Sequence, residues 1–80
     1  MSFVTPAHVY ALAEAEFSDL PVLAVDVDGE IAIFPQCTAT ERGARILTDA
    51  AALHDYTDGG ELDDVLAAQF AQELNQAHDL

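Results

Sequence analysis

The chain has 80 residues, of which 15 are Asp or Glu and 2 are Lys or Arg, giving a formal net charge of −13. Hydrophobic residues make up 51% of it, too large a share for a disordered acidic tail, so the chain is expected to fold. A surface this negative excludes direct binding to nucleic acid and favours a basic protein as partner, of which nucleic-acid-binding proteins are the commonest kind.

The length predicts one domain over residues 1–80 with a modest core, because a chain of this size buries only about 60–65% of the surface that its unfolded form exposes. Cys37 is the single cysteine, so no internal disulfide forms and a reducing compartment is indicated. The first thirty residues contain neither a basic n-region nor a long apolar run. These features predict a cytoplasmic protein with no membrane partner.

The first predicted element is a helix over residues 6–17. Thr5 supplies a hydroxyl N-cap, and Pro6 occupies the first helical position, where its missing N–H has no cost. Val4 and Val9 stand where a hydrophobic staple forms. The apolar stripe of this helix is Val9, Leu12, Ala13 and Phe17.

Residues 21–34 predict a β-hairpin, because Asp28-Gly29 lies between β-branched runs. A two-residue turn there pairs Val27 with Glu30 and scatters apolar side chains over both faces. A three-residue loop with Gly29 in the left-handed conformation pairs Asp26 with Glu30 and segregates the faces, so we favour it. It collects Leu23, Val25, Ile31 and Ile33 on one face. It also places two like charges opposite each other, which folding alone would not select.

Two more helices are predicted. Thr38 and Glu41 fit a capping box for a helix that runs to about His54. After an acidic loop, residues 61–77 show the clearest helical pattern, with apolar positions Leu62, Val65, Leu66, Phe70, Leu74 and Ala77. The predicted class is α+β in the order α-β-β-α-α, with helices covering a two-stranded antiparallel hairpin. A lone hairpin is marginal in water, so helices must cover it or another strand must pair with its edge.

No motif in the chain supports catalysis, a metal or a cofactor. The stretch that ends in Asp26-Val27-Asp28-Gly29 resembles the first motif of haloacid-dehalogenase-type phosphatases. That family needs a lysine, which this chain lacks, and a parallel sheet that does not fit in 80 residues. The glycine and acid spacing of a calcium loop and the His/Cys spacing of a zinc site are also missing. We therefore expect no enzyme.

The acidic residues themselves form the candidate partner-binding site. They fall into a hairpin group and a group around the loop before the last helix: Asp26, Asp28, Glu30, Asp55, Asp58, Asp63 and Asp64. Acids near a helix N-terminus also complement the helix dipole, which accounts for Glu61, Asp63 and Asp64 without any partner. It does not account for the hairpin group or for the scarcity of cations. Alternate residues on a strand face lie about 6.6–6.8 Å apart, close to the phosphate spacing along one DNA strand.

In size, charge and lack of catalytic motifs, the chain resembles phage-encoded anti-CRISPR proteins that compete for DNA-binding surfaces of CRISPR effectors. The resemblance is of class and transfers no residue. It implies an inhibitor, monomeric or homodimeric, that blocks target DNA binding by charge mimicry on a CRISPR effector complex, with a type I cascade favoured, in the host bacterial cytoplasm. Two alternatives remain. One is an interaction module, such as an antitoxin or accessory subunit, anchored by Val22 and Phe34 or by the hairpin edge. The other is a housekeeping protein of a high-salt cytoplasm.

Overall fold

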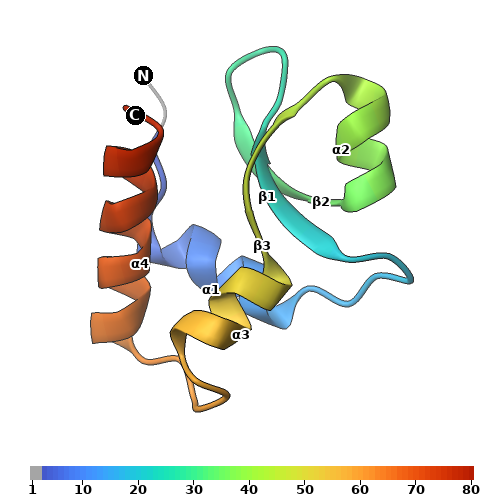
Figure 1. The fold of residues 1–80 in the computed structure, drawn as a ribbon. Coiled ribbons are helices and arrows are strands. Elements are labelled where there is room, and N and C mark those ends of the chain that lie inside the picture. Colours follow the sequence, from blue (N-terminus) through green and yellow to red (C-terminus); the bar gives the residue numbers. More distant parts are fainter. Residues whose placement is uncertain (1–2) are drawn as a thin grey trace.

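The computed structural model describes residues 3–80, which form four helices and a three-stranded antiparallel sheet (Figure 1). Along the chain these are α1 (Pro6–Glu14), β1 (Pro21–Val25), β2 (Ile31–Pro35), α2 (Gln36–Arg42), β3 (Arg45–Asp49), α3 (Ala50–Tyr56) and α4 (Asp64–Ala77). The strand order is β2-β1-β3, and both pairs are antiparallel. The predicted α+β class is confirmed.

The hairpin of β1 and β2 has the three-residue loop that we favoured. Val25 pairs with Ile31 and Leu23 with Ile33, and the Asp26 N–H donates to the Glu30 carbonyl at 2.8 Å. Gly29 has φ 90°, a conformation that a side chain disfavours, and its N–H closes the turn on the Asp26 carbonyl at 2.9 Å. The register is therefore set by one glycine and by the segregation of apolar side chains.

The predicted helix over residues 38–54 is wrong, because the chain forms α2, β3 and α3 there. Gly43 ends α2 in the left-handed conformation (φ 72°), and the Ala44 N–H then donates to the Ala39 carbonyl at 2.9 Å. The β-branched residues Ile46 and Thr48 follow in β3, which pairs with the free side of β1. The sheet thus has one strand more than the predicted hairpin, and this strand supplies the edge pairing that a lone hairpin lacks.

Helices cover both faces of the sheet. Leu23 and Leu47 point toward α1, α3 and α4 and join the main core, whose other buried members include Val9, Leu12 and Phe70. The opposite face is covered by the short helix α2 through a smaller cluster of Val22, Ala24 and Ala39. In Figure 1, α2 and α4 accordingly lie on opposite sides of the strands.

The two outer helices differ in detail from their predicted patterns. The N-cap position at Thr5 and the buried pair Val4 and Val9 are as predicted, although the Thr5 hydroxyl contacts His8 Nδ1 at 3.2 Å and not a helix N–H. The helix α1 ends at Glu14, which leaves Phe17 outside it and 42% exposed. The buried stripe of α4 is Ala67, Phe70, Ala71 and Leu74, whereas Val65 is 64% exposed. The core-facing side of α4 carries small alanines, because α1 packs closely against this helix.

Candidate partner-binding surface

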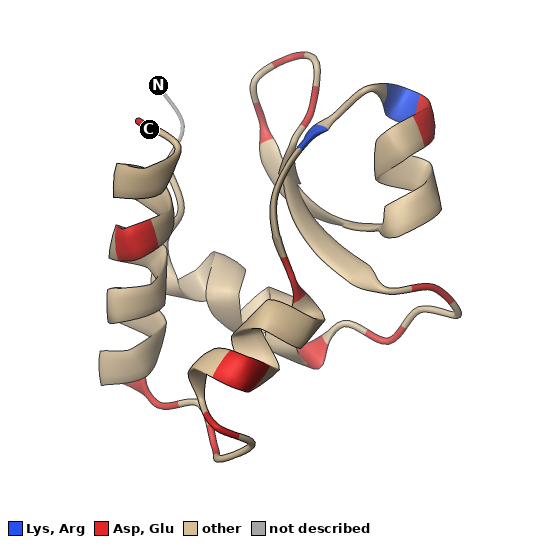
Figure 2. Ribbon diagram, in the orientation of Figure 1, with Lys and Arg blue, Asp and Glu red and all other residues tan. Residues whose placement is uncertain are grey.

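One end of the molecule gathers acidic side chains from three elements. The loop between α3 and α4 lies at the bottom of Figure 2, with the end of α1 and the start of α4 beside it. We call this region the acidic end and define it by the exposed residues Glu14, Asp55, Asp58, Glu61, Asp63 and Asp64. No lysine or arginine lies in it, since the only cations of the chain are Arg42 and Arg45.

Two of these carboxylates accept hydrogen bonds from the rest of the fold. Asp63 is the N-cap of α4, where its Oδ1 accepts from the Leu66 N–H at 2.8 Å. Asp64 Oδ1 accepts from the Tyr10 hydroxyl at 2.7 Å, which fastens α4 to α1 and raises the pKa of Tyr10. Each carboxylate keeps a second oxygen on an exposed residue, so both remain able to meet a cationic partner.

A pocket of about 340 Å³ places the end of α1 beside the α3–α4 region. Its lining brings Ala13 of α1 together with His54 and Gly60 of the α3–α4 region. Glu14 follows Ala13 directly and is exposed. Glu14 and Glu61 were not among the predicted partner-binding residues, and the nearness of Glu14 to residues 55–64 comes from the packing of α1 on α3 and α4.

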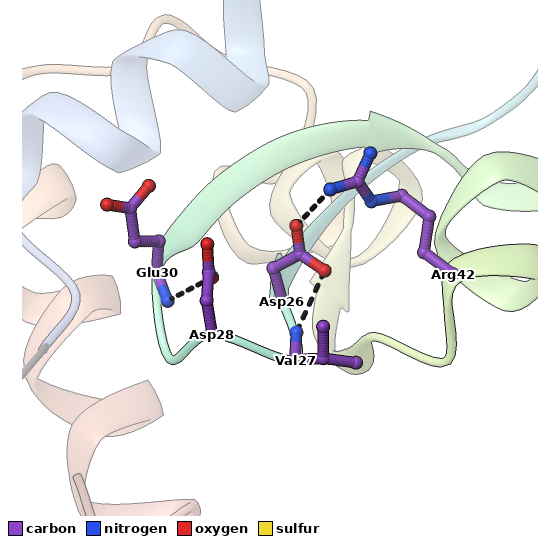
Figure 3. Close-up of polar contacts among 5 residues, drawn as sticks. All are labelled: Asp26, Val27, Asp28, Glu30 and Arg42. Carbon is purple, nitrogen blue, oxygen red and sulfur yellow. Dashed lines mark hydrogen bonds and ion pairs between the residues drawn. The ribbon is translucent and has the colours of Figure 1, made fainter.

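The three hairpin carboxylates differ in burial and in bonding, as Figure 3 shows for Asp26 and its partners. Asp26 is 9% exposed; its Oδ2 accepts from the guanidinium of Arg42, and its Oδ1 accepts from the Val27 N–H at 2.8 Å. Arg42 holds the pKa of Asp26 below its ordinary value of 3.8, with a further contribution from the Val27 N–H. Asp26 therefore serves the fold, and the predicted repulsion between Asp26 and Glu30 is relieved by Arg42.

Asp28 and Glu30 remain exposed at the tip of the hairpin. Asp28 Oδ1 accepts from the Glu30 N–H at 3.1 Å, and in Figure 3 the Asp28 carboxylate lies between those of Glu30 and Asp26, with no bond to Arg42. The hairpin tip lies at the top of the view in Figure 2 and the acidic end at the bottom. The two predicted acidic groups thus occupy opposite ends of the molecule and do not form a single row.

Both arginines are exposed, and both bond to residues of the same chain. Arg42 also lies over the ring of Phe34, with its guanidinium carbon 5.2 Å from the ring centre. Arg45 donates to the Nδ1 and the carbonyl of His78 at 3.3 and 3.4 Å, just after α4 ends. His78 Nε2 lies 3.1 Å from the Leu47 carbonyl, so this nitrogen carries the proton and Nδ1 is the acceptor. The cations therefore connect elements of the fold and leave the acidic end without compensation.

Asp19 is another acid that the fold uses. Its Oδ2 accepts from the Cys37 N–H and its Oδ1 from the Leu20 N–H, both at 2.9 Å, and these bonds lower the pKa of Asp19. It acts as a distant cap for α2, whose own N-cap residue, Pro35, offers no side-chain acceptor. Cys37 is exposed.

Within residues 3–80, no group of three or more His, Cys, Asp or Glu side chains is arranged to hold a metal ion. None of the helices described combines the length and apolar character needed to cross a membrane. Comparison of the chain with protein-family models, with curated proteins and with solved structures finds no match. Any functional assignment therefore depends on the geometry and charge of the chain itself.

Proposed function

We propose that this protein is an acidic inhibitor that occupies the nucleic-acid-binding surface of a basic partner protein and keeps nucleic acid from binding there. The observation that carries this proposal is the acidic end, where exposed carboxylates from α1, α3, α4 and their connecting loop gather with no cation among them. Such a surface matches a groove lined by Lys and Arg and steers fast association with it.

The partner that we propose is a CRISPR effector complex, first of all a type I cascade, in a bacterial cytoplasm. This choice is based on the class resemblance in size and charge to anti-CRISPR proteins. The blocked site would be the positively charged channel that receives target DNA. The inhibitor would act by occupancy, with Asp55, Asp58, Asp63 and Asp64 meeting the arginines and lysines that otherwise meet phosphates, and with Asp28 and Glu30 available for a separate contact.

The alternative of an apolar interaction module loses its two side-chain anchors in the structure but keeps the hairpin edge. Val22 is 1% exposed beneath α2, and Phe34 is covered by Arg42. The alternative of a high-salt housekeeping protein makes a different prediction, since acidity that serves solvation should leave the fold dependent on salt. Circular dichroism in dilute buffer separates this alternative from the proposed inhibitor, and we expect a folded chain there because the core is apolar and the Asp26 carboxylate is buried against Arg42.

The experiment that tests the proposal is capture from bacterial lysates, including lysates that express type I CRISPR complexes, followed by washes of rising salt. We expect a basic nucleic-acid-binding protein to be retained, to be released as salt rises and to be displaced by its own DNA, since screening weakens contacts between exposed charges. Capture that resists salt, or capture of an acidic protein alone, would count against charge mimicry.

A further inference from the structure

The two outer strands of the sheet, β2 and β3, differ in how well their free edges are protected against pairing with another strand. At the β3 edge, the ladder with β1 is interrupted between Leu23 and Ala24, which leaves Leu47 as an extra, bulged residue. The Leu47 carbonyl is occupied by His78 Nε2 at 3.1 Å. Bulges and covering side chains are devices by which proteins keep other strands from pairing with an edge.

The β2 edge has neither device. Its register with β1 is continuous from Ile31 to Pro35, and the strand contains no charged residue. Hydrogen bonds from the Asp26 N–H to the Glu30 carbonyl and from the Gln36 N–H to the Leu20 carbonyl fix the phase of the ladder. Because bonded and unbonded pairs alternate, the N–H and C=O groups of Ile31 and Ile33 point away from β1. No side chain among residues 3–80 hydrogen bonds to these groups.

We propose that the β2 edge receives an extended strand of the basic partner, which adds to the sheet through the outward backbone groups of Ile31 and Ile33. This inference rests on the proposed function for the chemistry of its occupant. The exposed carboxylates of Asp28 and Glu30 stand at the hairpin end of the edge, so the added strand carries Lys or Arg where it reaches the hairpin tip. A second copy of this chain would bring two charges of −13 together and is disfavoured.

The test uses a synthetic seven-residue peptide of alternating Lys and Val as a probe, with a Glu-for-Lys peptide as its control. Amide hydrogen exchange by NMR is read at single residues of the intact protein. In the free protein, we expect the Ile31 and Ile33 amides to exchange faster than those of Ala32 and Phe34, which bond to β1. We expect the basic peptide to slow exchange at Ile31 and Ile33 by about tenfold or more and the acidic peptide to leave it unchanged.

A variant in which strand addition is blocked can be made without changing any side chain. Ligation between Gln36 and Cys37 allows the chain to be assembled with a methyl group on the Ile33 nitrogen, which removes one outward donor. We expect the peptide effect to disappear while the Ala32 and Phe34 amides stay protected, which shows that the fold is intact.

Several results would overturn the inference. These are no protection by the basic peptide, equal protection by both peptides, protection that survives N-methylation, or protection in the free protein that grows with its concentration and so reports a second copy. Asp58→Asn with Glu61→Gln, which weakens the acidic end, should leave the peptide effect at Ile31 and Ile33 unchanged. Failure of strand addition is thereby separated from failure of the charge mimicry itself.

Discussion

The buried carboxylate of Asp26 is paired with the half-exposed guanidinium of Arg42. No other ion pair forms among residues 3–80. It joins the end of the hairpin to the end of α2, 16 residues further along the chain. In a chain with two cations, one of them neutralises the least exposed acid. Removing one partner of such a pair costs more than removing both, because it leaves a buried charge without compensation.

We therefore expect Arg42→Met to lower the free energy of unfolding more than Asp26→Asn, whose amide oxygen still accepts from Arg42 and from the Val27 N–H. The double variant should recover part of the loss caused by Arg42→Met. Urea unfolding of the four proteins in a double-mutant cycle measures the coupling. Additive effects of the two substitutions would show that the pair contributes nothing.

Gly43 is the residue at which the predicted helix over residues 38–54 ends as α2 and the chain continues into β3. A Cβ added at this position would meet no atom within 4 Å, so a substitution there tests the backbone conformation alone. We expect Gly43→Ala to lower the free energy of unfolding by about 1–2 kcal/mol, the cost of a left-handed residue with a side chain. Gly43→Asn should cost less, because asparagine adopts this conformation more readily. Equal losses for the two variants would contradict this explanation.

Asp63 separates the structural use of an acid from its charge. Asp63→Ala removes the cap of α4 and should cost about 1 kcal/mol of the free energy of unfolding. Asp63→Asn retains an oxygen that accepts from the Leu66 N–H and removes one of the repelling charges, so its stability should equal or exceed that of the parent. Thermal unfolding of both variants gives the comparison, and a loss in Asp63→Asn as large as in Asp63→Ala would mean that the charge itself stabilises the helix.

The stability of the protein should depend on pH in two opposing ways. Hydrogen bonds from Arg42 and from the Cys37 N–H lower the pKa of Asp26 and of Asp19 below the ordinary 3.8. Their stabilising contribution is fully present above that value and is lost as the pH falls through the lower pKa of the folded state. Repulsion within a chain of net charge −13 acts in the other direction, because it weakens as acid reduces that charge.

The free energy of unfolding should therefore hold or rise from about pH 7 to about pH 4 and fall below that. Urea unfolding across this range measures it. The double variant Asp19→Asn with Asp26→Asn should lose most of the acid fall, whereas Asp28→Asn should retain it. An unchanged acid fall in the double variant would show that other groups cause it.

The local signals in the sequence predicted the hairpin well, because Asp28-Gly29 and the alternation around it act over a few residues. They failed at residues 38–54, where Ile46, Leu47 and Ala50 satisfy a helical spacing and a strand equally well over so short a stretch. Gly43 carried the signal that decides between them. The length of α1 was also overestimated, because Phe17 fits the spacing of the predicted apolar stripe but lies outside the helix.

The candidate site was predictable only in part, because exposure and neighbourhood depend on tertiary contacts. The sequence places Asp55, Asp58, Asp63 and Asp64 close together, and the structure keeps them at one end of the molecule. It could not show that Arg42 neutralises Asp26, because that pair depends on how α2 folds back over the sheet. The contribution of Glu14 depends likewise on the packing of α1 against α3 and α4.

Two matched variants test whether the acidic end competes with nucleic acid. Asp58→Asn with Glu61→Gln removes two charges from the acidic end. Asp79→Asn with Glu41→Gln removes two exposed charges elsewhere. Asp58 and Asp79 have nearly equal positive φ values of 54° and 55°, so asparagine is tolerated equally at both.

The measurement is displacement of fluorescent target DNA from a purified type I CRISPR effector complex by each protein at several salt concentrations. We expect the parent to displace DNA, Asp58→Asn with Glu61→Gln to require about tenfold more protein, and the control pair to behave like the parent. All three should lose potency as salt rises. No displacement by the parent, or equal losses in the two paired variants, would contradict the claim that the acidic end stands in for DNA.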